Sequence, residues 1–263
     1  GDEILALTGE FPTVTLPWRR LNAGVRMVEI DPLPSDDRLG ALLAAIGTHT
    51  RVVVVSHINS FTGTLVDLDA LGRACAQAGA MLVSDGAQAA GAIPLTLDHV
   101  DFYIATGYKW LLSGFGTAVV ISKQSSMLQL KPTLLGHGNQ SPPPSLAYGH
   151  LNLAGAYALD AATALRQSIG LEAIYARIAK LARRAYNEAA TMGYRPAAAL
   201  ERTGGIVSLQ GIHEAHAVAA RLADSGVFVA ERDGYLRISP NFYTSDREID
   251  VLLTALRDVR ANR

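Results

Sequence analysis

The 263-residue chain contains little of what several common kinds of protein depend on. Cys75 is its only cysteine, which excludes an intramolecular disulfide and makes a reducing, cytoplasmic compartment the expectation. Lys and Arg (23) nearly balance Asp and Glu (24), so there is no basic excess to favour nucleic acid or an anionic membrane. No apolar run approaches transmembrane length, and the first residues lack the basic start and apolar core of a signal peptide. We therefore expect the partner to be a small molecule.

Several motifs are also missing. No G-x-G-x-x-G follows an expected strand, no G-K-[ST] is present, and no G-x-S-x-G elbow occurs, so nothing indicates a dinucleotide, P-loop or hydrolase site. His213 and His216 lie three residues apart rather than in H-E-x-x-H, with no further ligand cluster nearby. We expect no metal, and a solvated helix face at these histidines.

What is present is a regular alternation of apolar runs and helical patterns. Hydrophobic residues make up 49% of the chain, enough for a sizeable core. Buried strands are expected at 4–7, 27–30, 52–55, 80–83, 102–105 and 118–121, and helices at 38–46 and 68–78. Asp67 should cap the second helix and Gly79 should end it. Such alternation predicts an α/β protein with a mostly parallel sheet and helices on both faces.

The second half of the chain has a different pattern. Residues 130–145 are rich in Pro and Gly and predict a long loop, and residues 151–190 predict a long helix. A strand at 206–209, a helix at 214–223, strands at 227–230 and 235–238 and a helix at 246–259 follow. We therefore expect a large domain over 1–145, then a connecting helix and a small C-terminal α/β domain over 146–263.

Polar side chains follow three of the expected strands. Asn59 follows the strand at 52–55, Asp85 and Gln88 follow the strand at 80–83, and residues 106–109 follow the strand at 102–105. The carboxyl ends of parallel strands gather at one sheet edge. An acid, an amide, a hydroxyl and a lysine at one edge suit pyridoxal 5'-phosphate (PLP), because Lys109 can form a Schiff base with its aldehyde and a carboxylate can keep its pyridine nitrogen protonated.

The order of these residues resembles the class V aminotransferase family, which includes cysteine desulfurases, isopenicillin N epimerase-like proteins and kynureninase-like enzymes. The segments that carry the resemblance are SHINSFTG, SDGAQAAG, ATGYKW with SGFG close behind, and the late LRISPNFYTSDREIDVLL. The resemblance covers nearly the whole chain. It implies the aspartate-aminotransferase-like fold (PLP fold type I) with a small C-terminal domain, and an amino-acid substrate.

The resemblance also implies roles around the cofactor ring. Lys109 would carry the Schiff base and shuttle the proton. Asp85 would pair with the pyridine nitrogen and Gln88 with the ring oxygen, while Asn59 would sit near that oxygen or the substrate. Phe11, in GEFPTVTLPW, matches the position that stacks on the ring.

Further roles concern the phosphate and the substrate. The resemblance implies phosphate contacts for Thr106 and Tyr108, and places His150 where relatives have a threonine that reaches the phosphate of the neighbouring subunit. Arg237 matches the arginine that grips the substrate carboxylate with its fork geometry. A homodimer is therefore expected.

Two departures from the family pattern matter. Desulfurases need a reactive cysteine just before the Arg237 segment, where VFVAERDGYLR has none, and Cys75 lies within a helix expected to be buried. Relatives also begin with an N-terminal segment whose strand would lie beside residues 117–122; this chain starts after it. We expect the exposed edge at 117–122 to promote a dimer or larger assembly, and the cofactor to be held more weakly than in full-length relatives or to be absent.

Function is expected to be amino-acid chemistry at the α-carbon. Transamination is the first choice, and an epimerase or lyase is the alternative. Taken alone, Asp85 could equally be a turn residue and Lys109 a surface lysine. A non-catalytic, degenerate member of the fold is therefore the competing hypothesis.

Overall fold

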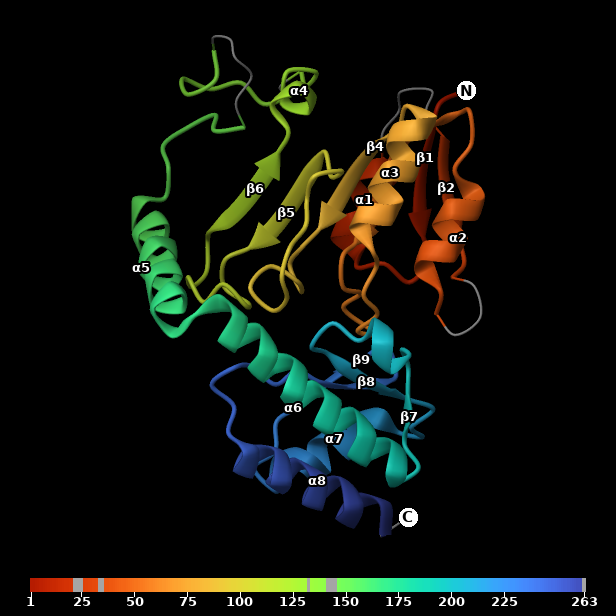
Figure 1. The fold of residues 1–263 in the computed structure, drawn as a ribbon, viewed down its shortest axis with the longest axis vertical. Helices are drawn as coiled ribbons and strands as arrows, with labels where there is room; N and C mark the ends of the chain where they lie inside the picture. Colours follow the sequence, from red (N-terminus) through yellow and green to blue (C-terminus); the bar gives the residue numbers. More distant parts are fainter. Residues whose placement is uncertain (21–25, 33–35, 132, 141–145, 262–263) are drawn as a thin grey trace.

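A six-stranded sheet forms the first half of the molecule in the computed structural model, which describes residues 1–20, 26–32, 36–131, 133–140 and 146–261. The strand order is β2-β1-β3-β4-β5-β6, with β6 antiparallel to β5 and all other pairs parallel (Figure 1). The strands are β1 (Glu3–Leu7), β2 (Arg26–Ile30), β3 (Thr50–Ser56), β4 (Met81–Asp85), β5 (Phe102–Thr106) and β6 (Ala118–Ser122). Each of the six expected strands is present, and the predicted mostly parallel sheet is confirmed.

Helices cover both faces of this sheet. Alternate residues of a strand point to opposite faces. In β1, Leu5 and Leu7 pack in the core beneath α2 (Arg38–Ala45) and α3 (Leu68–Ala78), whereas Ile4 and Ala6 pack with Val14 of α1 (Pro12–Arg19). Burial on both faces explains why these strands are continuous apolar runs.

The ends of α3 follow the sequence closely. Asp67 is the N-cap, and its side chain accepts hydrogen bonds from the backbone N–H groups of Asp69 and Ala70. Gly79 ends the helix in the left-handed conformation with φ +70°. Both caps were predicted and both are confirmed.

A second, four-stranded antiparallel sheet lies in the C-terminal half, in the order β7-β8-β10-β9 (Figure 1). Its elements and neighbours are β7 (Arg195–Pro196), η1 (Leu200–Arg202), β8 (Val207–Gln210), α7 (Ala215–Asp224), β9 (Ala230–Arg232), β10 (Tyr235–Ile238) and α8 (Asp246–Ala261). Leu209, Leu222, Leu236 and Leu256 lie in its core. The strand expected at 227–230 starts only at Ala230, because the N–H of Val227 closes the end of α7 on the carbonyl of Leu222.

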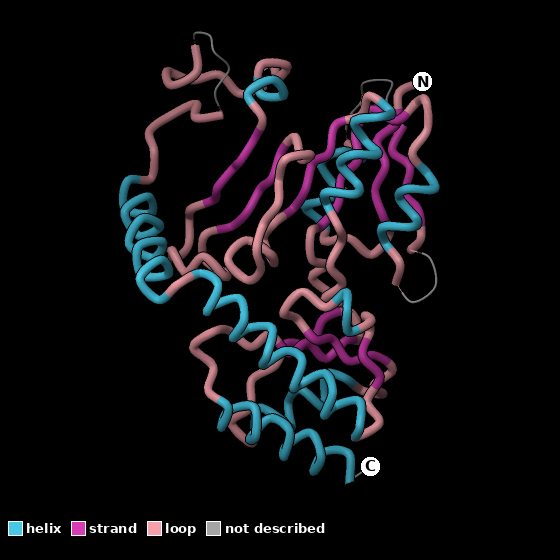
Figure 2. The backbone as a smooth tube through the Cα atoms, in the orientation of Figure 1, coloured by secondary structure: helices cyan, strands magenta, loops and turns pink. Residues whose placement is uncertain are grey.

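The long helix expected over 151–190 is two helices, α5 (Leu153–Ile169) and α6 (Leu171–Thr191). Gly170 separates them with φ +96°, a conformation that favours glycine. Figure 2 shows the resulting bend, with α5 beside the six-stranded sheet and α6 running to the second sheet. In the expected loop, residues 130–131 and 133–140 contain no helix or strand after α4 (Gln124–Met127), and 132 and 141–145 lie outside the described residues. The domain boundary at 145/146 stays a prediction.

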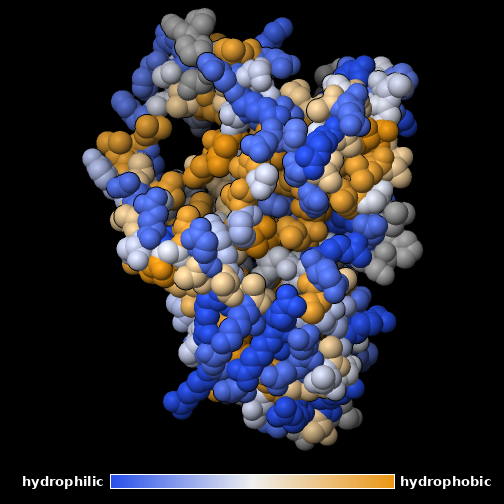
Figure 3. Space-filling model, viewed as in Figure 1, coloured by the Kyte–Doolittle hydropathy of each residue, from blue (hydrophilic) through white to orange (hydrophobic). Residues whose placement is uncertain are grey.

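The strand β6 forms one edge of the large sheet. Within the described ranges, β5 is its only strand partner. Val120 and Ile121 on this strand are exposed, as are Leu153 and Leu165 on α5. Figure 3 shows hydrophobic residues bordering the hollow between α5 and the sheet. None of the helices that the structure describes is long and apolar enough to cross a bilayer.

Candidate functional site

A cavity of about 440 Å³ opens at the carboxyl ends of β3, β4 and β5, on the face that α1 covers. Strand alternation decides which side chains reach it, since Val54, Val83 and Ile104 line its floor and the residues two positions later face the same way. Those residues are Ser56, Asp85 and Thr106, each the last of its strand. The predicted residues that line the cavity are Phe11, Asp85, Gln88, Thr106, Tyr108 and Lys109.

Asp85 ends β4, and a tight turn follows it. Its Oδ1 accepts a 2.8 Å hydrogen bond from the N–H of Ala87, and none of the described residues donates to Oδ2. Gly86 is required next to it, because a Cβ there would lie 2.2 Å from the ring of Tyr103. Burial raises the pKa of Asp85, and the N–H of Ala87 and the Lys109 charge only partly oppose this. Asp85 is thus a half-buried carboxyl that a cationic partner would stabilise in its charged form.

Lys109 lies in the turn that follows β5. Its Nζ is 5.9 Å from the ring centre of Phe11 and 5.7 Å from that of Tyr108, and it forms no ion pair with the described residues. Partial burial lowers its pKa; the charge of Asp85 opposes this and that of Arg237 adds to it. A lysine amine with a lowered pKa in a cavity is the usual state of a nucleophilic lysine.

A buried arginine holds the Lys109 turn in place. The guanidinium of Arg166 on α5 donates a 2.8 Å hydrogen bond to the carbonyl of Trp110 and a 2.7 Å bond to that of Gly91. The indole N–H of Trp110 in turn donates to Oε1 of Gln88 at 3.3 Å. Nε2 of Gln88 donates to none of the described residues. The turns after β4 and β5 are therefore tied together, and no sequence pattern indicated Arg166.

The hydroxyl of Thr106, which lines the cavity, is buried and has no hydrogen-bond partner among the residues that the structure describes. The ring of Tyr108 is 42% exposed and stacks on Phe115, with 4.8 Å between ring centres. An unpaired buried hydroxyl costs free energy unless a ligand satisfies it. Thr106 thus offers a donor to an acceptor-rich group such as a phosphate.

Phe11 forms the N-cap of α1 and is held by its neighbour in the chain. Glu10 is buried, and its carboxylate accepts hydrogen bonds from the hydroxyl of Ser56 and from Nη1 of Arg38 at 3.4 Å. Burial raises the pKa of Glu10, and the charge of Arg38 opposes this. Sequence reasoning missed Glu10, because the helix α1 that follows it was not predicted. Its contacts fix Phe11 against the cavity.

Arg237 lies on β10 and lines an adjoining cavity of about 540 Å³ together with Lys109 and Phe11. Its Nη1 donates a 2.9 Å hydrogen bond to the carbonyl of Ser60, and its buried Nε has no partner. Burial lowers the pKa of Arg237, and the nearby charge of Arg232 lowers it further. The structure thus brings Arg237 to the lysine, and its role as the carboxylate anchor stays a prediction.

Two predicted residues do not line either cavity. Asn59 donates to the carbonyl of Gly9 at 2.9 Å, and its Oδ1 accepts bonds from the N–H groups of Phe61 and Thr62 at 2.9 and 3.0 Å. Its amide therefore holds its own loop and ties it to the turn that follows β1. His150 is exposed, with its ring centre 4.7 Å from that of His137. Its predicted contact with a neighbouring subunit stays a prediction.

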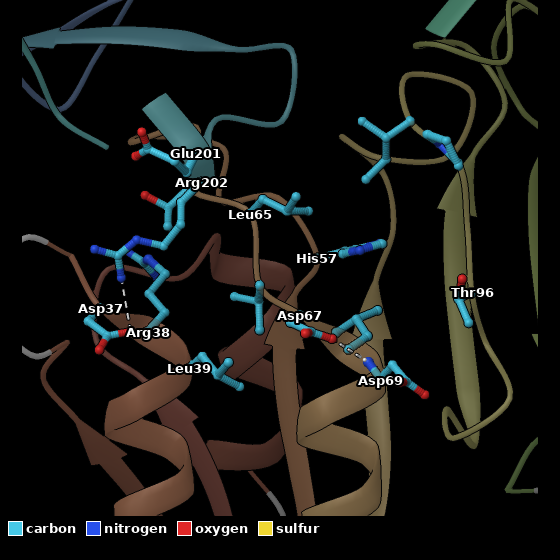
Figure 4. A pocket seen from close by; sticks show the side chains of 15 residues that line it. Asp37, Arg38, Leu39, His57, Leu65, Asp67, Asp69, Thr96, Glu201 and Arg202 are labelled. Atoms are coloured by element: carbon cyan, nitrogen blue, oxygen red, sulfur yellow. Dashed lines mark hydrogen bonds and ion pairs between the residues drawn. The ribbon is translucent and has the colours of Figure 1, made fainter. Parts of the chain in front are cut away.

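A third cavity, of about 470 Å³, lies behind the site on the side of α2 and α3 (Figure 4). An ion pair of 2.9 Å between Asp37 and Arg202 stands at one end of it. His57 lines it, and Nδ1 of this buried histidine is 3.1 Å from the hydroxyl of Tyr103. Burial lowers the pKa of His57 to about 4, which favours the neutral ring, and this ring packs edge-on against Tyr103 with 5.7 Å between ring centres. No group of three His, Cys, Asp or Glu residues in the described part of the chain could hold a metal ion.

Residues 1–252 match the family model described as aminotransferase class-V. A probable cysteine desulfurase of Vibrio cholerae serotype O1 is 28% identical, over 97% of this chain and 70% of that protein. Isopenicillin N epimerase of Streptomyces clavuligerus is 28% identical, over 97% of this chain and 73% of its own length.

Solved structures share the fold. The apo cysteine desulfurase of Thermococcus onnurineus NA1 has a TM-score of 0.84 at 24% identity, covering 100% of this chain and 74% of that one. A C-DES variant described as having glycine covalently linked to its PLP cofactor has a TM-score of 0.87 at 21% identity, covering 98% and 74%. The alanine–glyoxylate aminotransferase of Nostoc sp. has a TM-score of 0.76 at 20% identity, covering 99% and 75%. The predicted aspartate-aminotransferase-like fold is confirmed.

Proposed function

The chain belongs to the class V aminotransferase family, and on that premise we propose that it is a PLP-dependent enzyme that acts at the α-carbon of an amino acid, most simply by transamination. One observation carries the proposal: Lys109 and Asp85 reach the same cavity from neighbouring strands, together with the unpaired hydroxyl of Thr106. A ligand that uses all three groups must react with the amine of Lys109, present a cationic group to Asp85 and accept a hydrogen bond from Thr106.

The groups of the cavity fit PLP one by one. Lys109 can bond to the aldehyde, Asp85 can hold the protonated pyridine nitrogen, and Nε2 of Gln88 can donate to the ring oxygen. The hydroxyls of Thr106 and Tyr108 can donate to the phosphate. When bound, PLP supplies an electron sink for the charge that develops at the substrate α-carbon.

The residues of the chain would divide the remaining work. Burial lowers the pKa of Lys109, which favours the neutral amine, and Nζ in that form can take a proton from the α-carbon and return it elsewhere. Arg237 would hold the substrate carboxylate through its fork, which an ammonium group cannot reproduce. Phe11 would cover the ring and exclude water. These roles are proposals that rest on the placement of the side chains.

Desulfuration is not the reaction that we propose, although several relatives are described as cysteine desulfurases. Cys75 is the only cysteine, and it lies in α3 with 1% of its surface exposed. Burial raises the pKa of its thiol to about 12, so the nucleophilic thiolate is suppressed. Epimerisation is the second candidate, favoured by the 28% identity to isopenicillin N epimerase. There the proton would return to the α-carbon itself, on the face opposite to the one from which Nζ of Lys109 removed it.

The experiment is a PLP titration of the purified protein followed by borohydride. We expect a visible absorption band that borohydride removes, and no such band in Lys109→Ala. Lys180→Ala, on the exposed side of α6, is the matched control and should behave as the wild type. A keto-acid product indicates transamination, and inverted chirality with α-proton exchange indicates epimerisation. A wild-type protein without the band would overturn the proposal, whereas a band without any product would indicate a non-catalytic member.

A further inference from the structure

The cavity beside Lys109 is lined by cations and by no carboxylate. Lys109, Arg232 and Arg237 contribute to its wall, and every other lining residue is an aromatic, aliphatic, hydroxyl or amide side chain. This cavity differs from the neighbouring one, whose wall contains Asp85 and neither arginine. A cavity with this charge attracts anions. One arginine is enough to bind the α-carboxylate of a substrate, so the second arginine can bind another anionic group.

The hairpin of β9 and β10 places the two arginines on the same face. Arg232 pairs directly with Tyr235, and Arg237 lies two residues further along β10. Directly paired residues and residues two apart share a face, so the side chains of Arg232 and Arg237 are diagonal neighbours, with roughly 7–8 Å between their backbones. Asp233 and Gly234 turn the chain with φ +52° and +80°, the signature of a tight hairpin that fixes this register.

Neither guanidinium is neutralised within the described part of the protein. Arg237 donates to the carbonyl of Ser60, and Arg232 donates through Nη1 to the carbonyl of Glu231 at 2.8 Å. No carboxylate forms an ion pair with either of them. The charge of Arg232 even disfavours the charged form of Arg237, so the two repel each other until an anion binds. Two adjacent guanidiniums with no carboxylate partner among the described residues can each pair with one anionic group of a dianionic ligand.

We propose that the substrate is an amino acid with an acidic side chain, whose second carboxylate binds Arg232 while its α-carboxylate binds Arg237. This inference rests on the proposed PLP chemistry and names its substrate class. The cofactor phosphate does not account for Arg232, because Thr106 and its unpaired hydroxyl line the other cavity, which neither arginine lines. Tyr243 and Asn241 line the same wall and can donate to the distal carboxylate.

The test compares acids with their isosteric amides on the PLP-loaded protein. Binding of L-aspartate against L-asparagine, and of L-glutamate against L-glutamine, is measured from the change in the visible spectrum. We expect the wild type to prefer one acid over its amide by about tenfold or more, since a charge-assisted pair is lost in the amide. Arg232→Gln should weaken the acid far more than the amide and so remove this preference. Arg237→Gln should weaken acid and amide alike.

Two further variants sharpen the result. Arg232→Glu should reverse the preference, and because Arg232 is exposed on the hairpin this change leaves the core intact. Arg183→Gln, on the exposed face of α6, is the control and should keep the wild-type preference. Equal affinity for acid and amide in the wild type, or an unchanged preference in Arg232→Gln, refutes the substrate class alone. Absence of the borohydride-sensitive band refutes the proposed function instead.

Discussion

Replacing Arg166 by methionine tests whether this arginine positions the lysine. The Arg166 side chain is 4% exposed on α5, and its two hydrogen bonds reach the carbonyls of Trp110 and Gly91. Methionine fills similar space with an unbranched apolar chain but donates nothing. Gly91 has φ +93°, and a Cβ there would lie 2.7 Å from the carbonyl of Trp110, so the two turns have no room to find other partners.

The expected loss of stability follows from these contacts. Each buried carbonyl left without a donor costs about 1–3 kcal/mol, and the relief of removing a buried charge offsets part of the total. We expect a net destabilisation of about 3 kcal/mol. For a chain of this size, 1 kcal/mol lowers the melting temperature by roughly 2 °C, which makes the expected shift about 6 °C.

Thermal unfolding with and without saturating PLP is the assay, and a PLP titration accompanies it. Arg166→Lys should fall between wild type and Arg166→Met, because one ammonium group can serve only one carbonyl well. Arg183→Met, on the exposed side of α6, is the control for the loss of a charge. A melting temperature for Arg166→Met within 1 °C of wild type would refute the stability argument. A lower melting temperature with unchanged PLP affinity would refute the positioning of Lys109.

Three other predictions are open to direct measurement. Asp85→Asn should still bind PLP covalently at Lys109 but lose most of its turnover, because a neutral amide cannot hold the pyridine nitrogen protonated; unchanged turnover would contradict that role. Burial lowers the pKa of His57 from 6.5 to about 4, so its contribution to stability is complete above pH 6.5 and is lost as the pH falls to about 4. The loss is about 3 kcal/mol. The free energy of unfolding of His57→Gln, measured with denaturant, should therefore change less with pH over this range than that of the wild type, and an equal change would contradict the role of His57. The exposed edge of β6, with Val120 and Ile121, predicts a homodimer or larger assembly in light scattering, and a monomer at micromolar concentration would count against it.

The sequence predicts the large sheet well because its strands are buried on both faces. Runs such as Val52 to Val55 are long enough and branched enough to leave little choice of structure. The helix α1 was not predicted, since Pro17 within it and its short length obscure the helical pattern. The break at Gly170 was overlooked because apolar periodicity continues on both sides of it.

The site shows a different limit. The end of a strand can be predicted from the sequence, and the alternation of side chains along the strand then decides to which face of the sheet each residue points. This is why Asp85 and Thr106 share a cavity with Lys109. Asn59 lies three residues beyond its strand, where the conformation of the loop and not the pleat of the strand decides where a side chain points. Its Oδ1 accepts hydrogen bonds from the loop backbone instead of facing the cavity. Strand ends are therefore stronger predictors of a site than the loops that follow them.

Arg166 and Arg232 illustrate the two kinds of residue that sequence reasoning missed. Arg166 binds carbonyls 56 and 75 positions away, and a backbone acceptor leaves no mark in the sequence, so only the fold could reveal it. Arg232 was readable: Asp233-Gly234 between short apolar runs predicts a two-residue hairpin, and that register alone places Arg232 on the face of Arg237. A turn motif thus carries information about the charge of a cavity, because it fixes which side chains meet across it.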